Sequence, residues 1–303
     1  MIADDCEGAP SAPQRAAPSP SPPHLSVLTG KRSDRACAAA NLLRTMLTGI
    51  FADRASAMVK SGGFIVGVAS ALDLPEATIS GAFRVLRESG LMTSGARGVN
   101  APDMTYLDAA RMLIAMLVSE RPAYAECSVR DFGQLICLEF TPASMRLEML
   151  PELTGEQRAE FTRMSADFTL NGRGLPERHT FEQAVSELIR MYSEDINEDY
   201  WLRSQLDVGE RGKFDPNTRI EVVPGLLEAR IEMQGNIYEY CDALIDPKRW
   251  GEDESPEGIQ ADLDAEEAHD LKRSRYSTAI RSVRSVDTIR IAALASIISG
   301  EKE

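Results

Sequence analysis

The chain has 303 residues, 43% of them apolar, which suffices for about two domains with ordinary buried cores. Its 33 Lys and Arg against 47 Asp and Glu give a net charge of −14. Residues 31–122 nevertheless hold 11 basic and 8 acidic residues, so the acidic excess lies elsewhere in the chain. The overall charge therefore does not exclude nucleic-acid binding by this first part.

The five cysteines are an odd number, lie far apart and form no C-x-x-C pair, which argues against a disulfide framework and a zinc ribbon. Residues 1–32 are rich in Pro, Ala and Ser and predict a disordered tail rather than a secretory signal. No apolar run approaches the roughly 18 residues of a transmembrane helix. We therefore expect a cytoplasmic protein that does not contact membranes.

Two helices joined by a short turn are predicted within residues 64–91. A preceding helical stretch over residues 33–61 is expected to end at Gly62 and Gly63. In the second of the two helices, Ile79, Phe83 and Leu86 repeat at i, i+4 and i+7 and predict an inner, buried face.

The connection between these helices carries further signals. Ala69 supplies a small residue where the helices cross, and Leu72 and Leu74 are expected to bury the turn. Asp73 and Glu76 stand three residues apart at the expected start of the second helix, as an N-cap pair does.

The run from Ile65 to Leu91 resembles the helix-turn-helix of winged-helix transcription regulators. The resemblance implies that the second helix enters the major groove, reading base edges near its N-terminus and reaching phosphate or guanine with cations further along. The residues expected on its outer face are Thr78, Ser80, Gly81, Arg84 and Arg87.

A glycine-containing loop follows at residues 92–104, where winged-helix proteins place their wing. Its Arg97 is expected to contact the phosphate backbone or the minor groove. Thr105 and Asp108 then predict the N-terminal cap of an apolar helix that closes a core or a dimer seam. The loop sequence is also similar to phage- or prophage-type regulators.

Residues 123–250 predict an α+β domain. Residues 128–140 fit either a strand or a helix, whereas Thr180 and Gln183 form a capping-box signature before a helix at 181–192. Alternating residues predict strands over Arg219–Val223 and Glu228–Tyr240, with a turn at Gly235-Asn236.

The C-terminal residues divide by charge. Residues 251–270 contain nine acids and no Lys or Arg, and predict a solvated loop. Residues 271–303 predict a basic helix, whose arginines either neutralise that loop or bind phosphate.

Signatures of catalysis are missing from the sequence. The three histidines have no metal-ligand spacing, and no G-x-S-x-G, Walker A or G-x-G-x-x-G motif occurs. We expect structural roles for His179 and His269, and a protein that is not an enzyme and has no metal or cofactor.

The expected fold is mostly helical α+β, with a winged-helix-like domain at residues 33–122 followed by an acidic α+β domain for oligomerisation or partner binding. The function that fits best is a sequence-specific regulator of transcription that binds double-stranded DNA. Two alternatives stay open: a phage-type replication or DNA-packaging accessory protein, and an adaptor that binds protein through its acidic half. The target sequence and the sign of regulation do not follow from the residues.

Overall fold

The computed structural model describes residues 59–95, 102–119, 121–148, 154–166, 169–194, 218–246, 253, 255–276 and 282–299. All of them belong to one compact unit, Leu47–Glu303. The described part is 61% helical and 15% strand, which confirms a mostly helical α+β protein. The predicted tail at 1–32 and most of the predicted helical stretch at 33–61 lie outside the described residues.

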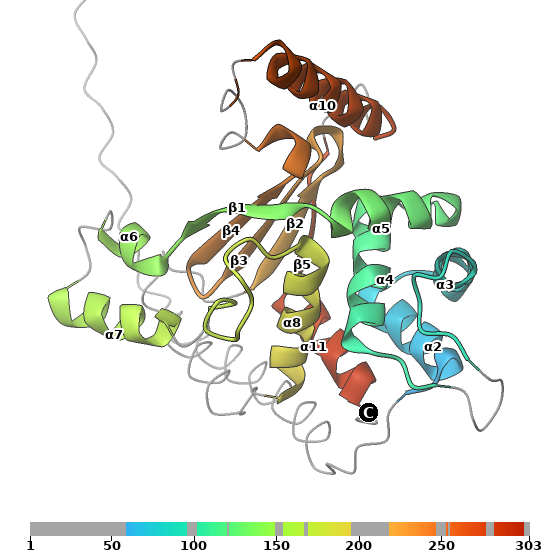
Figure 1. Cartoon of the computed structure of the whole chain (residues 1–303). Coiled ribbons are helices and arrows are strands. Elements are labelled where there is room, and N and C mark those ends of the chain that lie inside the picture. Colours follow the sequence, from blue (N-terminus) through green and yellow to red (C-terminus); the bar gives the residue numbers. More distant parts are fainter. Residues whose placement is uncertain are drawn as a thin grey trace, which may run out of the picture. The chain divides into compact units, whose positions relative to one another are not determined.

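The described part of the chain begins with three helices: α2 (Ser61–Leu72), α3 (Glu76–Glu88) and α4 (Tyr106–Val118) (Figure 1). The expectation that Gly62 and Gly63 end a helix is wrong, because both lie in the first turn of α2. A first-turn glycine costs little here, since α2 is held by the burial of Phe64 and Val68 one turn further on.

The connection to the sheet resolves the ambiguous residues 128–140. The 3-10 turn η2 (Pro122–Tyr124) leads into α5 (Ala125–Gly133), and β1 (Ile136–Thr141) follows, so the segment is helix first and strand second. After α6 (Ala143–Glu148) and α7 (Gly155–Ala166) comes α8 (Phe181–Glu194).

The predicted capping box of α8 is confirmed. The Thr180 amide donates to the Gln183 side-chain oxygen at 2.9 Å, and the Gln183 amide donates to the Thr180 hydroxyl at 3.3 Å. Two amides that would otherwise lack partners at the start of α8 are thereby satisfied.

An antiparallel sheet of five strands, in the order β1-β4-β3-β2-β5, forms the centre. Its other strands are β2 (Arg219–Val223), β3 (Glu228–Met233), β4 (Asn236–Cys241) and β5 (Arg284–Asp287), which confirms the predicted β element. The hairpin turn is Gln234-Gly235, with φ of 51° and 79°, one residue before the predicted position. Positive φ at both central residues is what a tight hairpin requires.

The C-terminal predictions need correction. Residues 256–274 form the helix α10 (Pro256–Ser274) instead of a solvated loop, and β5 and α11 (Thr288–Ser299) replace a single basic helix. Ser255 caps α10 by accepting from the Gly258 amide at 3.1 Å, and Pro256 takes the first helical position. Acids toward the start of this helix and Lys272 and Arg273 in its last turn also suit the helix dipole.

One hydrophobic core runs from Phe64 to Ile298, so no boundary near residue 122 separates two cores. Helices α4, α8 and α11 lie against one face of the sheet, and α11 also packs on α2 (Figure 1). A Cβ placed on Gly67 of α2 would meet Ile297 of α11 at 2.9 Å, so the two helices approach closely at this glycine. Among the described residues, no helix is long and apolar enough to span a membrane.

Candidate nucleic-acid interface

The turn between α2 and α3 is made by Asp73, Leu74 and Pro75. Asp73 adopts the left-handed conformation with φ 54° and ends α2, and the Leu74 amide donates to the Ala69 carbonyl at 3.0 Å. The predicted N-cap pair Asp73 and Glu76 is therefore wrong: the N-cap of α3 is Pro75, and no side chain caps the helix. The positive φ places Asp73 in the C-cap of α2, where a short polar side chain tolerates it.

The inner face of α3 is the one that the sequence predicts. Ile79, Phe83 and Leu86 are all buried, and the Phe83 ring lies 6.0 Å from that of Phe64 on α2. Ala69 is 8% exposed, and Leu74 packs, partly buried, against the same core. These contacts fix the rotation of α3 and so determine which of its side chains face solvent.

The predicted outer-face residues divide into two groups. Ser80, Arg84 and Arg87 are exposed on one stripe of α3, whereas Thr78 and Gly81 are half-buried on a flank. A Cβ added at Gly81 would lie 3.1 Å from Pro122, so this glycine packs against η2 instead of facing open solvent. Arg97 lies outside the described residues.

The charges on the exposed stripe are balanced. Arg84 lies 4.0 Å from Glu88 in an exposed ion pair, and the Arg87 guanidinium lies over the Phe83 ring at 5.8 Å. Glu76 is also exposed, so two cations and two carboxylates share this side of the helix. An ion pair this long and exposed contributes little to stability, which leaves Arg84 available to a ligand.

Residues that sequence reasoning missed flank α3. Arg121 and Tyr124 belong to the segment around η2, and Arg130 on α5 donates to the Ser89 carbonyl at the end of α3, at 3.4 Å. Arg130 also pairs with Glu126 at 2.9 Å. Only tertiary packing brings these residues beside α3, so no local sequence pattern marks them.

The loop after α3 is tied at both of its described ends to one buried carboxylate. Asp108 accepts from the amide and the hydroxyl of Thr93, both at 2.7 Å, and from those of Thr105, at 2.7 and 2.8 Å. The Asp108 amide donates in turn to the Thr105 hydroxyl, which confirms the predicted cap of α4. Within the described residues 91–95 and 102–105 no strand occurs.

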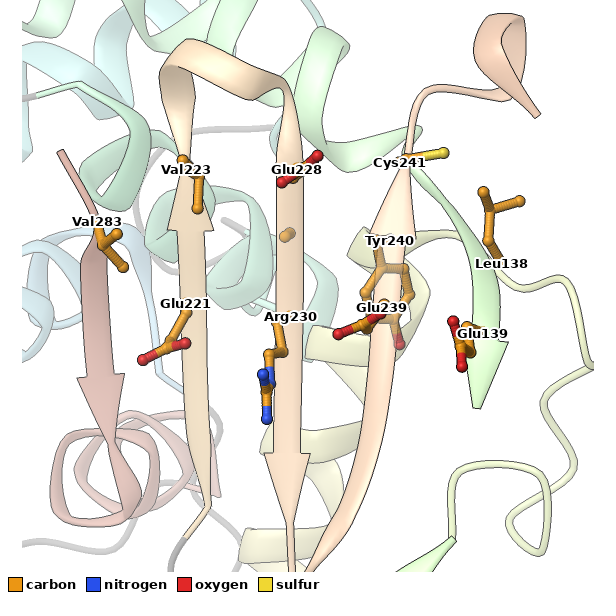
Figure 2. A pocket seen from close by; sticks show the side chains of 11 residues that line it. Leu138, Glu139, Glu221, Val223, Glu228, Arg230, Glu239, Tyr240, Cys241 and Val283 are labelled. Atoms are coloured by element: carbon orange, nitrogen blue, oxygen red, sulfur yellow. The ribbon is translucent and has the colours of Figure 1, made fainter. Parts of the chain in front are cut away.

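The open face of the sheet holds a cavity of about 390 Å³ (Figure 2). Glu139, Glu239, Arg230 and Glu221 stand in register on four neighbouring strands, with Arg230 between two of the carboxylates. Cross-strand pairs of opposite charge, such as Arg230 with Glu239 and with Glu221, stabilise a sheet. The like-charged pair Glu139 and Glu239 destabilises it.

This cavity lacks an activated nucleophile. Cys241 lies on its lining, but burial, and secondarily the carboxylates of Asp246, Asp242 and Glu228, raise its pKa to about 12. A thiol with this pKa stays protonated at neutral pH and reacts poorly. The part of the chain that the structure describes contains no group of three His, Cys, Asp or Glu side chains able to hold a metal ion.

The two predicted structural histidines are buried in the fold. The His179 Nδ1 donates to the Pro176 carbonyl at 2.7 Å, so Nε2 of the neutral ring accepts from the Tyr240 hydroxyl at 2.8 Å, and burial lowers the pKa of His179. His269 of α10 contacts Asp242 at 3.4 Å. Both histidines thus join secondary-structure elements and point to no substrate.

The two surfaces therefore differ in what they offer a ligand. The exposed side of α3 carries a hydroxyl, two arginines and two carboxylates on a rigidly packed helix, and the open sheet face carries four carboxylates and one arginine. No protein-family model, curated protein or solved structure matches this chain.

Proposed function

We propose that this protein binds double-stranded DNA through α3 and acts as a sequence-specific, non-enzymatic regulator of transcription. The observation that carries the proposal is the exposed stripe of Ser80, Arg84 and Arg87, opposite a face of α3 that is locked by Ile79, Phe83 and Leu86. A helix held in this way loses little further freedom when it enters a groove.

The order of the side chains along α3 suits major-groove binding. Ser80 lies in the first half of the helix and offers a short hydrogen-bonding group to base edges, while Arg84 and Arg87 follow within reach of guanine or phosphate. Thr78 lies at the flank, where it contributes through its hydroxyl, whereas Gly81 packs against Pro122 and allows η2 to lie close to α3. Arg97 in the following loop contacts the phosphate backbone in this proposal.

One observation favours a second function. Glu76 and Glu88 balance the two arginines on α3, and α10 exposes several carboxylates, so an adaptor that binds a basic protein is the alternative. In that case α3 presents a mixed-charge surface of the kind that protein partners recognise.

Selection of bound sites from a pool of random duplexes separates these functions. A regulator enriches a defined sequence, and its affinity for the selected duplex exceeds that for random duplexes by orders of magnitude at moderate salt. A phage-type accessory protein binds duplexes with little preference, and an adaptor binds none. Enriched sites with inverted repeats would in addition indicate a homo-oligomer.

A further inference from the structure

The segment around η2, residues 121–124, packs along one flank of α3. Pro122 contacts this flank at Gly81, and Figure 1 shows α5, which continues from η2, close to α3. The exposed residues of this segment therefore lie near α3.

Two of these residues have polar groups available to a ligand. Arg121 is exposed, and among the residues that the structure describes no carboxylate pairs with it. Tyr124 is 43% exposed, and its hydroxyl makes no hydrogen bond within the described part of the chain. A guanidinium and a phenolic hydroxyl both donate hydrogen bonds to phosphate oxygens.

The neighbouring cation on α5 strengthens the charge of this flank. Arg130 is held near the C-terminal end of α3 by Glu126 and by the Ser89 carbonyl. Among the described residues of this flank, Arg121 and Arg130 lie with the one carboxylate of Glu126, in contrast to the acidic surfaces of α10 and the open sheet face. The electrostatic field therefore favours an anionic ligand at the flank of α3 and disfavours one at α10 and at the open sheet face.

We propose that Arg121 and Tyr124 bind the phosphate backbone of the DNA strand that lies beside α3. This inference rests on the proposed function and extends it with a contact that fixes the orientation of the helix on the duplex without reading sequence. The packing of Pro122 against Gly81 brings the two contacts together as parts of one interface.

The test measures the affinity of the full chain for a labelled selected duplex and a labelled random duplex over a range of salt concentrations. We expect Arg121→Ala to weaken binding to both duplexes by the same factor and to lower the slope of log affinity against log salt by about one. Tyr124→Phe removes one uncharged hydrogen bond, so it should weaken binding by about two- to tenfold and leave the slope unchanged. Arg290→Ala, which removes an exposed arginine from α11, serves as the matched control.

The outcomes separate this inference from the proposed function. An Arg121→Ala variant with the slope of the wild type, or with an altered preference between the two duplexes, overturns the phosphate contact while DNA binding stands. A wild-type protein that binds neither duplex overturns both. Arg121→Lys should restore the wild-type slope of log affinity against log salt, and the melting temperature should be unchanged in all variants. This result would support a contact that depends on the positive charge.

Discussion

Asp108 is the residue on which the geometry after α3 depends. Its buried carboxylate accepts four hydrogen bonds from Thr93 and Thr105, so one side chain joins the start of α4 to the segment that leaves α3. The pair Thr105 and Asp108 is visible in the sequence as a cap. The bonds to Thr93 are not, because they bridge 15 residues of chain.

Replacing Asp108 should destabilise the protein substantially. Asp108→Ala removes the acceptor of four hydrogen bonds: the donors of half-buried Thr93 then cost about 1–3 kcal/mol for each unsatisfied group, whereas those of exposed Thr105 are rehydrated at lower cost. Asp108→Asn keeps the shape of the side chain but has fewer hydrogen-bond acceptor positions, so it should lower the free energy of unfolding by less. Urea unfolding measures both, with the exposed Asp264→Ala as control, and equal stabilities of Asp108→Ala and wild type would contradict this role.

His179 should make folding stability depend on pH. Burial lowers its pKa below the ordinary value of 6.5, so the unfolded chain takes up the proton first as the pH falls. The contribution of the neutral ring is fully present above about pH 6.5 and is lost as the pH falls toward the folded-state pKa.

Thermal unfolding between neutral and mildly acidic pH checks this expectation. The melting temperature of the wild type should fall more steeply below about pH 6.5 than that of His179→Gln, which has no titrating ring. The comparison is between slopes, because the variant also loses the contact with Tyr240 and starts from a lower stability. Parallel curves for the two proteins would show that His179 titrates normally.

At the scale of elements, α10 has a narrow attachment to the rest of the fold. Only Ala265 and His269 are buried within this helix, and Asp242 joins it to the end of β4 through His269 and through Lys272 at 3.0 Å. Past its C-terminal end, the Tyr276 hydroxyl donates to Asp131 of α5 at 2.7 Å. The sequence shows the many acids of this segment but not the single buried carboxylate that anchors it.

Asp242→Asn should loosen α10 without unfolding the sheet. Hydrogen bonds to charged groups contribute about 1.5–3 kcal/mol, so amide exchange across residues 256–274 should accelerate by about tenfold or more. The rate of amide exchange in α8 should be the same as in the wild type. Glu267→Gln, on the exposed side of the same helix, is the matched control. Unchanged exchange in α10 would mean that other contacts hold it.

For the whole molecule, the predictions from sequence succeeded where the signal is local. The spacing of Ile79, Phe83 and Leu86 and the cap at Thr180 concern neighbouring residues, and the structure confirms them. The contacts of Gly67 with Ile297 and of Gly81 with Pro122 join distant segments, and a single sequence contains no signal for them. For the same reason, the sequence did not show that the buried core extends across the predicted boundary near residue 122, or that Thr78 and Gly81 are half-buried.

The single core makes a fragment of residues 33–122 unstable. Helix α4 buries ten of its 13 residues, and its partners include α5 and α8, both of which the fragment lacks entirely. The described part of the full chain should unfold in one cooperative thermal transition, and the fragment should show none. A fragment that melts sharply at the temperature of the full chain would restore the two-domain description.

The most direct test of DNA binding by α3 is a fluorescence anisotropy titration of the selected duplex at moderate salt. We compare the wild type with Arg84→Ala, Arg87→Ala and the control Arg290→Ala. We expect each α3 variant to lose about 1–3 kcal/mol of binding free energy while its melting temperature stays that of the wild type, and the control to bind normally. Equal affinities for the wild type and both α3 variants would contradict it.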